Sequence, residues 1–213
     1  MQFNGSIALI AAGLSSPLKF LQKRLHAFSH YIAVDGGLDI LHALGICPDL
    51  IIGDFDSVHQ EALSAYSQIP RLKFPRDKDH SDLELALDYA LQVHTKGKPL
   101  HVFGAMGGRN DHALANLYLL SRYPNQVVFE SDKELIFAAV GEVELPCHPG
   151  QSVSFLPLEQ AGEIISSGLR WELNKACFNH SFFSLSNECL GNVVKLYIET
   201  GTLLCFLQKK VDE

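Results

Sequence analysis

Aspartates stand at four places that each follow a strand-like segment, and this repetition points to chemistry on a charged ligand. Asp35 opens an Asp-Gly-Gly triplet, Asp54 and Asp56 share the segment Gly-Asp-Phe-Asp-Ser, residues 77–82 contain three more, and Asp111 follows a glycine-rich loop. In open α/β sheets, ligands bind at the carboxyl ends of the strands. We therefore expect these carboxylates to gather at one edge of a sheet.

The segment Gly-Asp-Phe-Asp-Ser carries the sharpest of these signals. In an extended chain Asp54 and Asp56 would face the same side, with β-carbons about 6–7 Å apart, while Phe55 would face the core. Facing carboxylates repel unless a cation lies between them, and Mg²⁺ is usually held by one or two carboxylates together with substrate phosphates. Taken alone, the segment fits solvated turn aspartates or helix caps equally well. Repetition of Asp at neighbouring strand ends favours a magnesium site.

A second acidic cluster, formed by Asp77, Asp79 and Asp82, follows the next predicted strand. Asp79 could complete the oxygen shell of the metal. Asp82 lies in the first turn of a predicted helix, where the helix dipole by itself favours a carboxylate. For Asp77 and Asp82 a structural role is as well supported as a functional one.

The loop after the fifth predicted strand has the character of a phosphate-binding loop. Gly107 and Gly108 permit close backbone approach, Arg109 offers a planar fork of donors, and the helix that follows presents its N-terminus to anions. The loop lacks the Gly-Lys-Ser/Thr of a Walker A sequence, and a tight turn with a surface Arg is the alternative. His112 and Asn116 lie four apart on one helical face, which suits a shared ligand or a buried hydrogen-bonded pair equally.

Further along the chain, one aromatic and three polar side chains suggest a site for a flat heterocycle. Trp171 is the only tryptophan, and Ser184, Ser186 and Asn187 follow within one predicted strand. Alternation would put the two hydroxyls on the same strand face. A lone tryptophan more often belongs to a core, so these residues by themselves are a weak signal.

The elements that must position these residues alternate between strand and helix in the first part of the chain. Ser81 and Glu84 form a capping-box pattern that starts the clearest helix, which we expect to end near Thr95, before Gly97. Such alternation predicts βαβ units and a mostly parallel, Rossmann-like sheet. The expected strands are Gly5–Ala12, Tyr31–Asp35, Asp49–Asp54, Arg71–Pro75 and Leu100–Ala105, and the expected helices are Pro17–His30, Leu38–Leu44, Ser81–Thr95 and Asp111–Arg122.

After residue 130 the pattern changes to strands alone, punctuated by glycines. We therefore predict two domains, an α/β nucleotide-binding domain over residues 1–130 and a β-sandwich over residues 131–213. The expected strands of the second domain are Leu135–Val140, Gln151–Leu158, Leu169–Leu173, Phe182–Ser186, Val193–Glu199 and Thr202–Leu207.

Composition limits the classes of protein and partner. With 47% hydrophobic and 19% charged residues, the 213-residue chain is of ordinary globular type. A formal net charge of -7 disfavours nucleic acid as a partner. The five scattered cysteines, without a CxxC pair, suggest buried free thiols in a reducing compartment. The apolar stretch Ile7–Leu14 is too short to span a bilayer, so we expect a cytoplasmic protein that does not bind membranes.

Together these segments resemble the thiamine pyrophosphokinase (thiamine diphosphokinase) family. They occur in family order over nearly the whole chain, and the combination of Gly-Asp-Phe-Asp-Ser with Gly-Gly-Arg is highly specific. The chain departs from the family's usual pattern at Lys78, Asn110 and Leu185. The matching segments are Asp35–Gly37, Pro48–Ser57, Asp77–Asp82, Gly107–His112, Gly168–Trp171 and Ser184–Asn187.

The resemblance implies an enzyme that transfers the diphosphoryl group of ATP to the hydroxyl of thiamine, with Mg²⁺, in a homodimer whose thiamine sites lie between subunits. Expected catalytic residues are Asp54, Asp56, Asp79, Arg109 and Asp111, the first three also holding the metal. Expected ATP contacts are Asp35, Gly36, Gly37, Ser57, Gly107, Gly108, Arg109 and His112, and expected thiamine contacts are Asp82, Trp171, Ser184, Ser186 and Asn187.

Two other hypotheses remain open at this point. One is diphosphoryl transfer to another hydroxymethyl heterocycle, such as a pterin. The other is a non-catalytic protein that binds a nucleotide or thiamine. The number of carboxylates argues against the latter, because a simple binder of anionic phosphate gains little from them.

Overall fold

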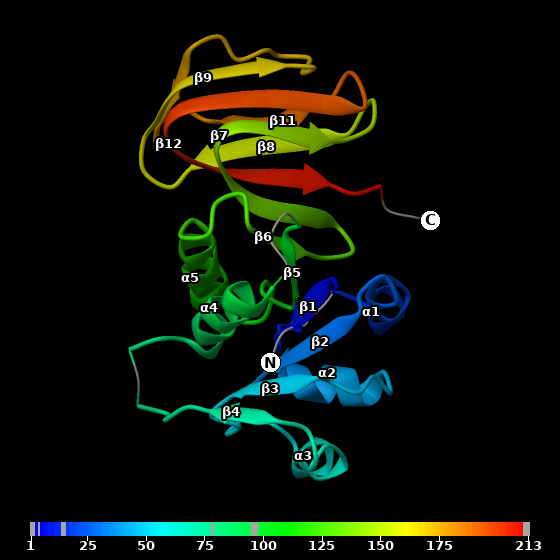
Figure 1. Ribbon diagram of the computed structural model, residues 1–213. Coiled ribbons are helices and arrows are strands. Elements are labelled where there is room, and N and C mark those ends of the chain that lie inside the picture. Colours follow the sequence, from blue (N-terminus) through cyan, green and yellow to red (C-terminus); the bar gives the residue numbers. More distant parts are fainter. Residues whose placement is uncertain (1–2, 4, 14–15, 78, 95–97, 211–213) are drawn as a thin grey trace. The chain divides into compact units, whose positions relative to one another are not determined.

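The computed structural model describes residues 3, 5–13, 16–77, 79–94 and 98–210, which form two compact units (Figure 1). The first unit comprises Met1–Ala113 and Phe129–Ser131, and the second comprises Leu114–Val128 and Asp132–Glu213. The division crosses helix α5 (Asn110–Leu120) and strand β6 (Val127–Glu130), so each unit contains more than one stretch of the chain.

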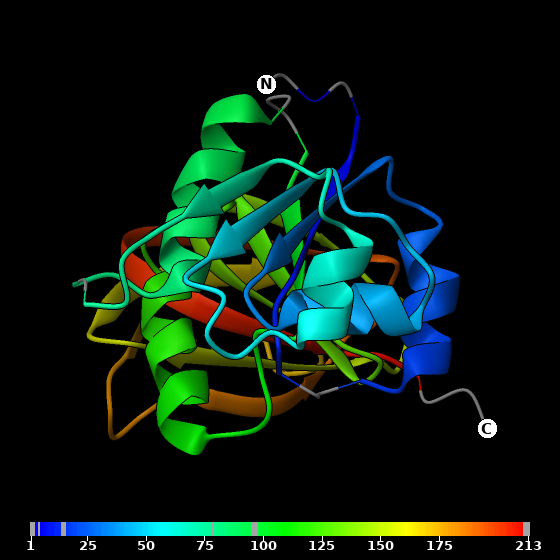
Figure 2. The ribbon, with the colours of Figure 1, turned by 90° about the horizontal axis from the view of Figure 1, so that it is seen from below.

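The first unit is built on a parallel sheet whose strands follow the spatial order β5-β1-β2-β3-β4, with β4 at the edge. Because every pairing among these strands is parallel, their carboxyl ends meet at one edge, and Figure 2 shows their arrows running the same way. The strands are β1 (Ile7–Ile10), β2 (His30–Val34), β3 (Leu50–Gly53), β4 (Arg71–Lys73) and β5 (Leu100–Phe103).

Helices are packed on this sheet because its central strands are apolar on both faces. One core cluster joins Ile10 and Phe103 of the sheet to Leu25, Leu41 and Ala62 of the first three helices. The fourth helix contacts β2 and β3. None of the described helices has the length and apolar character needed for a bilayer crossing. The helices are α1 (Leu18–Leu25), α2 (Gly37–Ala43), α3 (Gln60–Ala65) and α4 (Asp82–Val93).

Two glycines allow backbone segments of this unit to approach closely. A β-carbon on Gly37 would lie 1.8 Å from the carbonyl oxygen of Ile10, and one on Gly104 would lie 2.2 Å from that of Ala11. The loops after β1 and β5 are joined by a hydrogen bond from the Gly13 amide to the Gly104 oxygen, 2.9 Å long. These contacts seat the start of α2 and the end of β5 against β1.

A buried carboxylate connects α1 to the sheet on the side of β5. Glu130, 4% exposed, accepts hydrogen bonds from Arg24 Nε and Nη2 at 2.6 and 3.1 Å, and its Oε2 lies 2.6 Å from His101 Nδ1. Buried charges are retained only when they are paired in this way.

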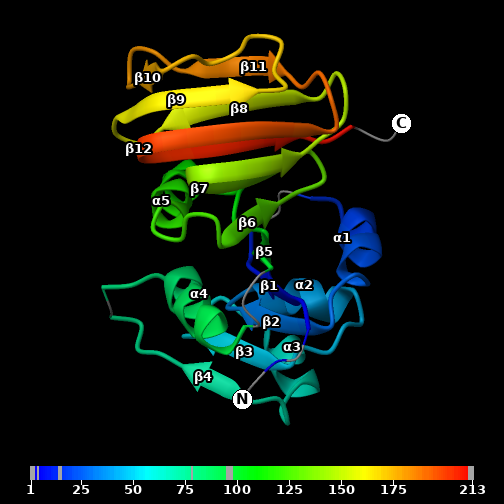
Figure 3. The same cartoon turned by 45° about the horizontal axis from the view of Figure 1, so that its top comes forward.

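The second unit consists mainly of antiparallel strands around β7 (Glu134–Pro146) and β12 (Val193–Gln208), which pair along both halves of their length (Figure 3). The first half of β12 also pairs with β9 (Ala161–Ser167), and the second half with β8 (Ser152–Pro157). β10 (Ala176–Phe178) then pairs with β9, and β11 (Ser184–Glu188) with β8.

The two halves of β12 join at an irregularity that contains Gly201, which has φ of 81°. A β-carbon there would lie 2.2 Å from the Gln160 oxygen. β12 therefore stays paired with β7 on both sides of the register shift, while its other edge pairs with β9 before the shift and with β8 after it. The sequence predicted two separate strands here, and the structure shows a single long one.

The expected change from alternating elements to strands alone is confirmed within the described residues, with several corrections. α3, β6, β9 and β10 were not predicted. The predicted strand Leu169–Leu173 is wrong: the backbone amides of Gly168 and Leu169 donate to the Glu172 carboxylate, at 2.7 and 3.0 Å, and only Leu169 makes a bridge. A local side-chain acceptor thus replaces a strand partner.

Other corrections concern element ends and cysteines. Helix α4 ends at Val93, and the predicted end near Thr95 and Gly97 falls outside the described residues. All five cysteines are free thiols, but Cys47 and Cys177 are exposed rather than buried.

We expect Gly37→Ala to destabilise the first unit strongly. The added methyl meets backbone atoms of Ile10, which cannot rotate away, so the loss should reach about 3 kcal/mol or more. Thermal denaturation followed by circular dichroism measures this. The matched control is Gly191→Ala, where nothing lies within 4 Å of the new methyl. Equal melting of both variants would contradict the close approach.

Candidate active site

Three carboxylates from separate elements meet at the carboxyl edge of the parallel sheet. Asp35 follows β2, Asp54 follows β3 and Asp82 begins α4, and one oxygen of each lies within 4.8 Å of the others. Among the described residues this is the only group of three or more metal-ligating side chains. The sequence expected such a gathering, and the structure shows which residues form it.

Asp35 is held in an unusual backbone conformation by its neighbours. Its φ is 47°, and its amide donates to the Ile52 oxygen at 2.8 Å. Ser57 Oγ donates to Oδ2 at 2.5 Å, and Oδ1 is buried with no hydrogen-bond partner among the residues that the structure describes. A β-carbon at Gly53 would lie 3.1 Å from the Asp35 β-carbon, so glycine lets the two strand ends approach.

These residues fit a divalent cation. Carboxylates this close repel one another, and an oxygen buried without a partner is costly. Mg²⁺ takes oxygen ligands of this kind, so a bound cation would relieve both penalties. The buried Oδ1 of Asp35 is therefore the observation that favours a metal over a merely solvated acidic cluster.

Asp56 and Asp79 lie outside this group. The extended geometry expected for Asp54 and Asp56 is not formed, because β3 ends at Gly53 and Phe55 has φ of 69°. Instead, Asp54 Oδ1 accepts the Asp56 amide at 3.0 Å, and the Asp56 carboxylate pairs with Arg76 Nε at 3.3 Å. As expected, Phe55 packs on the core of the first unit.

The turn before α4 sets the position of Asp82. Ser81 Oγ accepts the Glu84 amide at 3.2 Å, as the capping-box pattern predicts. Asp82 therefore lies in the first helical turn, where a carboxylate is stabilised by the dipole. Asp77 and Asp79 on the preceding loop are exposed. Lys78, one of the departures from the family pattern, lies outside the described residues.

The glycine-rich loop before α5 presents an exposed ion pair. Gly107 and Gly108 have φ of 94° and 69°. Arg109 donates from Nε and Nη2 to both oxygens of Asp111, at 3.1 and 2.5 Å. This side-chain hydrogen bonding raises the pKa of Arg109 and lowers the pKa of Asp111 to about 2. His112 donates its amide to Asp111 and is itself exposed.

In the second unit, a buried amide holds the loop that carries Trp171. Asn187 is 2% exposed; its Oδ1 accepts the Trp171 amide at 3.2 Å, and its Nδ2 donates to the Trp171 oxygen at 2.8 Å. The indole is 58% exposed, and the guanidinium of Arg170 lies 5.3 Å from its centroid. Trp171 is thus a surface residue rather than part of a core.

The two serines near Asn187 do not follow simple strand alternation. Ser186 has φ of 54°, and the pairing of β11 with β8 shifts register between Ser184 and Asn187. The Ser186 amide donates to Ser154 Oγ at 3.0 Å. Regular alternation, from which the two hydroxyls were expected on one face, is therefore not formed here, because the bulge changes the period of two.

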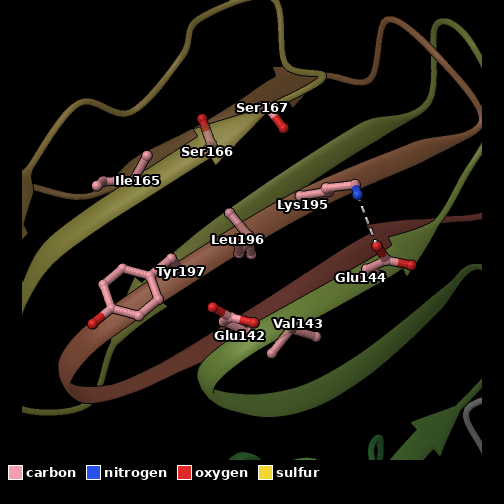
Figure 4. A pocket seen from close by; sticks show the side chains of 9 residues that line it. All are labelled: Glu142, Val143, Glu144, Ile165, Ser166, Ser167, Lys195, Leu196 and Tyr197. Carbon is pink, nitrogen blue, oxygen red and sulfur yellow. Dashed lines mark ion pairs between the residues drawn. The ribbon is translucent and has the colours of Figure 1, made fainter.

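A shallow groove of about 520 Å³ lies on the sheet of the second unit (Figure 4). Lys195 Nζ and Glu144 Oε1, from neighbouring strands, form an ion pair of 3.0 Å at one end of it, and Tyr197 and Ile165 lie at the other end. None of the predicted site residues lines it. Its lining is Glu142, Val143, Glu144, Ile165, Ser166, Ser167, Lys195, Leu196 and Tyr197.

Comparison with known families connects these features. Residues 21–129, more than half of the chain, match the family described as thiamin pyrophosphokinase, catalytic domain. Residues 142–203 match thiamin pyrophosphokinase, vitamin B1 binding domain. The chain belongs to the thiamin pyrophosphokinase family. The resemblance predicted from the sequence is therefore confirmed.

Relatives of similar length agree with this membership of the thiamin pyrophosphokinase family. Thiamine pyrophosphokinase of Bacillus subtilis (strain 168) is 29% identical over 208 residues, covering 93% of this chain and 96% of that protein. A crystal structure of thiamine pyrophosphokinase from B. subtilis has 25% identity and a TM-score of 0.81, covering 96% and 99%. The structure of thiamin pyrophosphokinase from Geobacillus thermodenitrificans shares the fold, with a TM-score of 0.82, 23% identity, and coverage of 96% and 97%.

Sequence reasoning missed two residues that contact or shape the site. Arg76 pairs with Asp56, and Glu172 shapes the turn before Trp171. Arg76 resembles an ordinary surface charge, and its only signal is that it immediately precedes the acidic run. Glu172 carries no local signal, because its partners are determined by the turn itself.

We expect Asp35→Asn to stabilise the metal-free protein by about 1 kcal/mol, or ~2–4 °C in melting temperature for a chain of this size. The variant removes one of three mutually repelling charges and keeps an acceptor for Ser57. It should also lose the thermal stabilisation that Mg²⁺ gives the parent chain. Differential scanning calorimetry with and without Mg²⁺ measures both effects.

Glu159→Gln removes one exposed negative charge from the second unit and is the matched control. It should change neither the metal-free melting temperature nor the response to Mg²⁺. An Asp35→Asn protein that Mg²⁺ stabilises as much as the parent would contradict the metal assignment.

Proposed function

We propose that this chain is a thiamine diphosphokinase that converts ATP and thiamine to AMP and thiamine diphosphate. The observation that carries the proposal is the match to both family domains in a chain whose carboxylates meet at the edge of the parallel sheet. The first unit would be the Rossmann-like nucleotide-binding domain, predicted over residues 1–130. The second would be the thiamine-binding β-sandwich, predicted over residues 131–213.

The reaction moves one diphosphoryl group. The thiamine hydroxyl oxygen attacks the β-phosphorus of ATP, the bond between that phosphorus and the α–β bridging oxygen breaks, and AMP leaves with the bridging oxygen. The hydroxyl proton passes to a nearby carboxylate. When bound, Mg²⁺ supplies positive charge that screens the phosphates from the acidic residues.

The residues of the chain would divide the remaining work between binding and orientation. Asp54 belongs both to the predicted metal ligands and to the observed acidic group, while Asp56 and Asp79 stay predictions from the resemblance. Arg109 would exchange its exposed partner Asp111 for phosphate oxygens, which its planar fork suits. The remaining ATP contacts, Asp35, Gly36, Gly37, Ser57, Gly107, Gly108 and His112, are proposed unchanged.

The thiamine side of the proposal rests on an exposed aromatic platform. Trp171 offers an indole face on which a cationic or flat ring can stack, and Asn187 fixes its backbone. We keep Asp82, Ser184, Ser186 and Asn187 as predicted thiamine contacts. A homodimer with thiamine sites between subunits, and a cytoplasmic location, also stay predictions.

The direct test is release of AMP and formation of thiamine diphosphate from ATP, Mg²⁺ and thiamine by the purified chain. Asp54→Asn should lower kcat by more than about 100-fold, or ~2.7 kcal/mol. Glu61→Gln, on an 89% exposed side chain, is the control and should keep the activity of the parent chain. If the chain diphosphorylates a hydroxymethyl pterin and not thiamine, the pterin is the substrate and the proposal is wrong on this point.

We expect Trp171→Ala to raise the KM for thiamine far more than the KM for ATP. A desolvated stacking contact with a cation contributes up to about 2 kcal/mol, which corresponds to ~30-fold in affinity. Leu190→Ala, also an exposed apolar residue of the second unit, should leave both KM values unchanged. Steady-state kinetics on the two variants measures this.

Mixed dimers test where the thiamine site lies. If each site uses both subunits, co-refolding Trp171→Ala with Asp54→Asn chains gives dimers with one intact site, and part of the activity returns. A raised thiamine KM without such rescue would move the site within one subunit.

A further inference from the structure

The loop between β3 and α3 carries Asp54 and Asp56, and two carboxylates of the β2–α2 segment bind its far end. Asp35 Oδ2 accepts Ser57 Oγ at 2.5 Å. Asp39, four residues later in the first turn of α2, accepts the His59 amide at 3.2 and 3.4 Å and contacts His59 Nδ1 at 2.8 Å. The loop is therefore attached at two points that are two residues apart.

These two attachments have different exposure and different consequences. The Asp39 side chain is 25% exposed, whereas the His59 ring is 82% exposed. A contact to so exposed a ring contributes little by itself, so we take the backbone amide as the part of His59 through which Asp39 acts. The neighbouring Val58 is buried in the core of the first unit and so helps to hold the segment between Ser57 and His59.

Nearer β3, the loop is also held by Phe55, which packs on the core of the first unit, and by the ion pair between Asp56 and Arg76. Its bends are local, with φ of 69° at Phe55 and an internal bond from the Asp56 amide to Asp54 Oδ1. Ser57 lies only two residues before His59, so its position also depends on the point where the loop enters α3. Ser57 in turn occupies Asp35 Oδ2, and so fixes the orientation of a carboxylate that belongs to the acidic group with Asp54 and Asp82.

We propose that Asp39 is a positioning residue for the metal-binding carboxylates, which acts by holding the His59 backbone amide so that Ser57 orients Asp35. Asp39 itself is no member of the acidic group found among the described residues. The inference rests on the magnesium role of that group in the proposed function. It adds a residue that nothing in the reaction chemistry requires, and it explains why an acidic residue lies in the first turn of α2.

The test measures binding of Mn²⁺ alone to the purified chain by electron paramagnetic resonance, without nucleotide or thiamine. Asp39→Ala should weaken Mn²⁺ binding about tenfold, or ~1.4 kcal/mol. Asp39→Asn keeps an oxygen acceptor for the amide and should stay within about threefold of the parent chain. Thermal denaturation in a chelator shows whether each variant is folded.

A matched pair at position 59 separates the amide from the ring. His59 has φ of -65°, the value that proline adopts, so His59→Pro removes the amide hydrogen without changing φ. His59→Ala removes the same ring and keeps the amide. His59→Pro should weaken Mn²⁺ binding about as much as Asp39→Ala, and His59→Ala should change it less than twofold.

The outcomes are separable from those of the proposed function. Unchanged Mn²⁺ affinity in Asp39→Ala and His59→Pro overturns the positioning role, as does weakening in Asp39→Ala without weakening in His59→Pro. If Asp39→Ala does not fold, the pair at position 59 decides alone. A parent chain without measurable Mn²⁺ binding also overturns it. A chain that binds Mn²⁺ with this pattern but does not diphosphorylate thiamine overturns only the proposed function.

Discussion

Mutual repulsion of three carboxylates within 4.8 Å is the constraint on which the first unit depends. Such a group disfavours the folded state unless a cation accompanies it, so the surrounding structure must hold it in place. The apolar strands of the parallel sheet do this, because β1 and β3 are buried along their whole length. Burial of that apolar surface stabilises a geometry that the charges alone would disperse.

Close approach of backbone segments brings the strand ends, and the carboxylates that follow them, near one another. Gly53 lets the end of β3 lie against Asp35, and Gly37 lets α2 start directly beside β1. Larger residues would separate the strand ends and the carboxylates with them. Asp35 and Phe55 also have positive φ. Such sparsely populated backbone conformations persist only where neighbouring contacts hold them.

Two arginines in loops that follow β4 and β5 are already paired in the protein by itself. Arg76 pairs with Asp56 and Arg109 with Asp111, both in exposed positions where ion pairs contribute little. Exchange of these partners for phosphate oxygens therefore costs little, and it would bring two cations toward a polyanionic substrate. In the second unit, by contrast, the interaction is buried: the side-chain amide of Asn187 bonds the backbone of Trp171 and so holds the loop that carries the exposed indole.

The sequence by itself determined the family, the parallel sheet with its acidic strand ends, the capping of α4 by Ser81, and the inward packing of Phe55. These features follow from the hydrophobic periodicity, the turn residues and the short motifs, all of which depend on residues close together in the sequence. Only the tertiary structure decided which carboxylates meet. Phe55 turns the chain out of the extended form and sends Asp56 to Arg76, while strand adjacency brings Asp35 and the helix start brings Asp82 to Asp54. Those contacts join residues distant in sequence, and no local pattern encodes the distance between them.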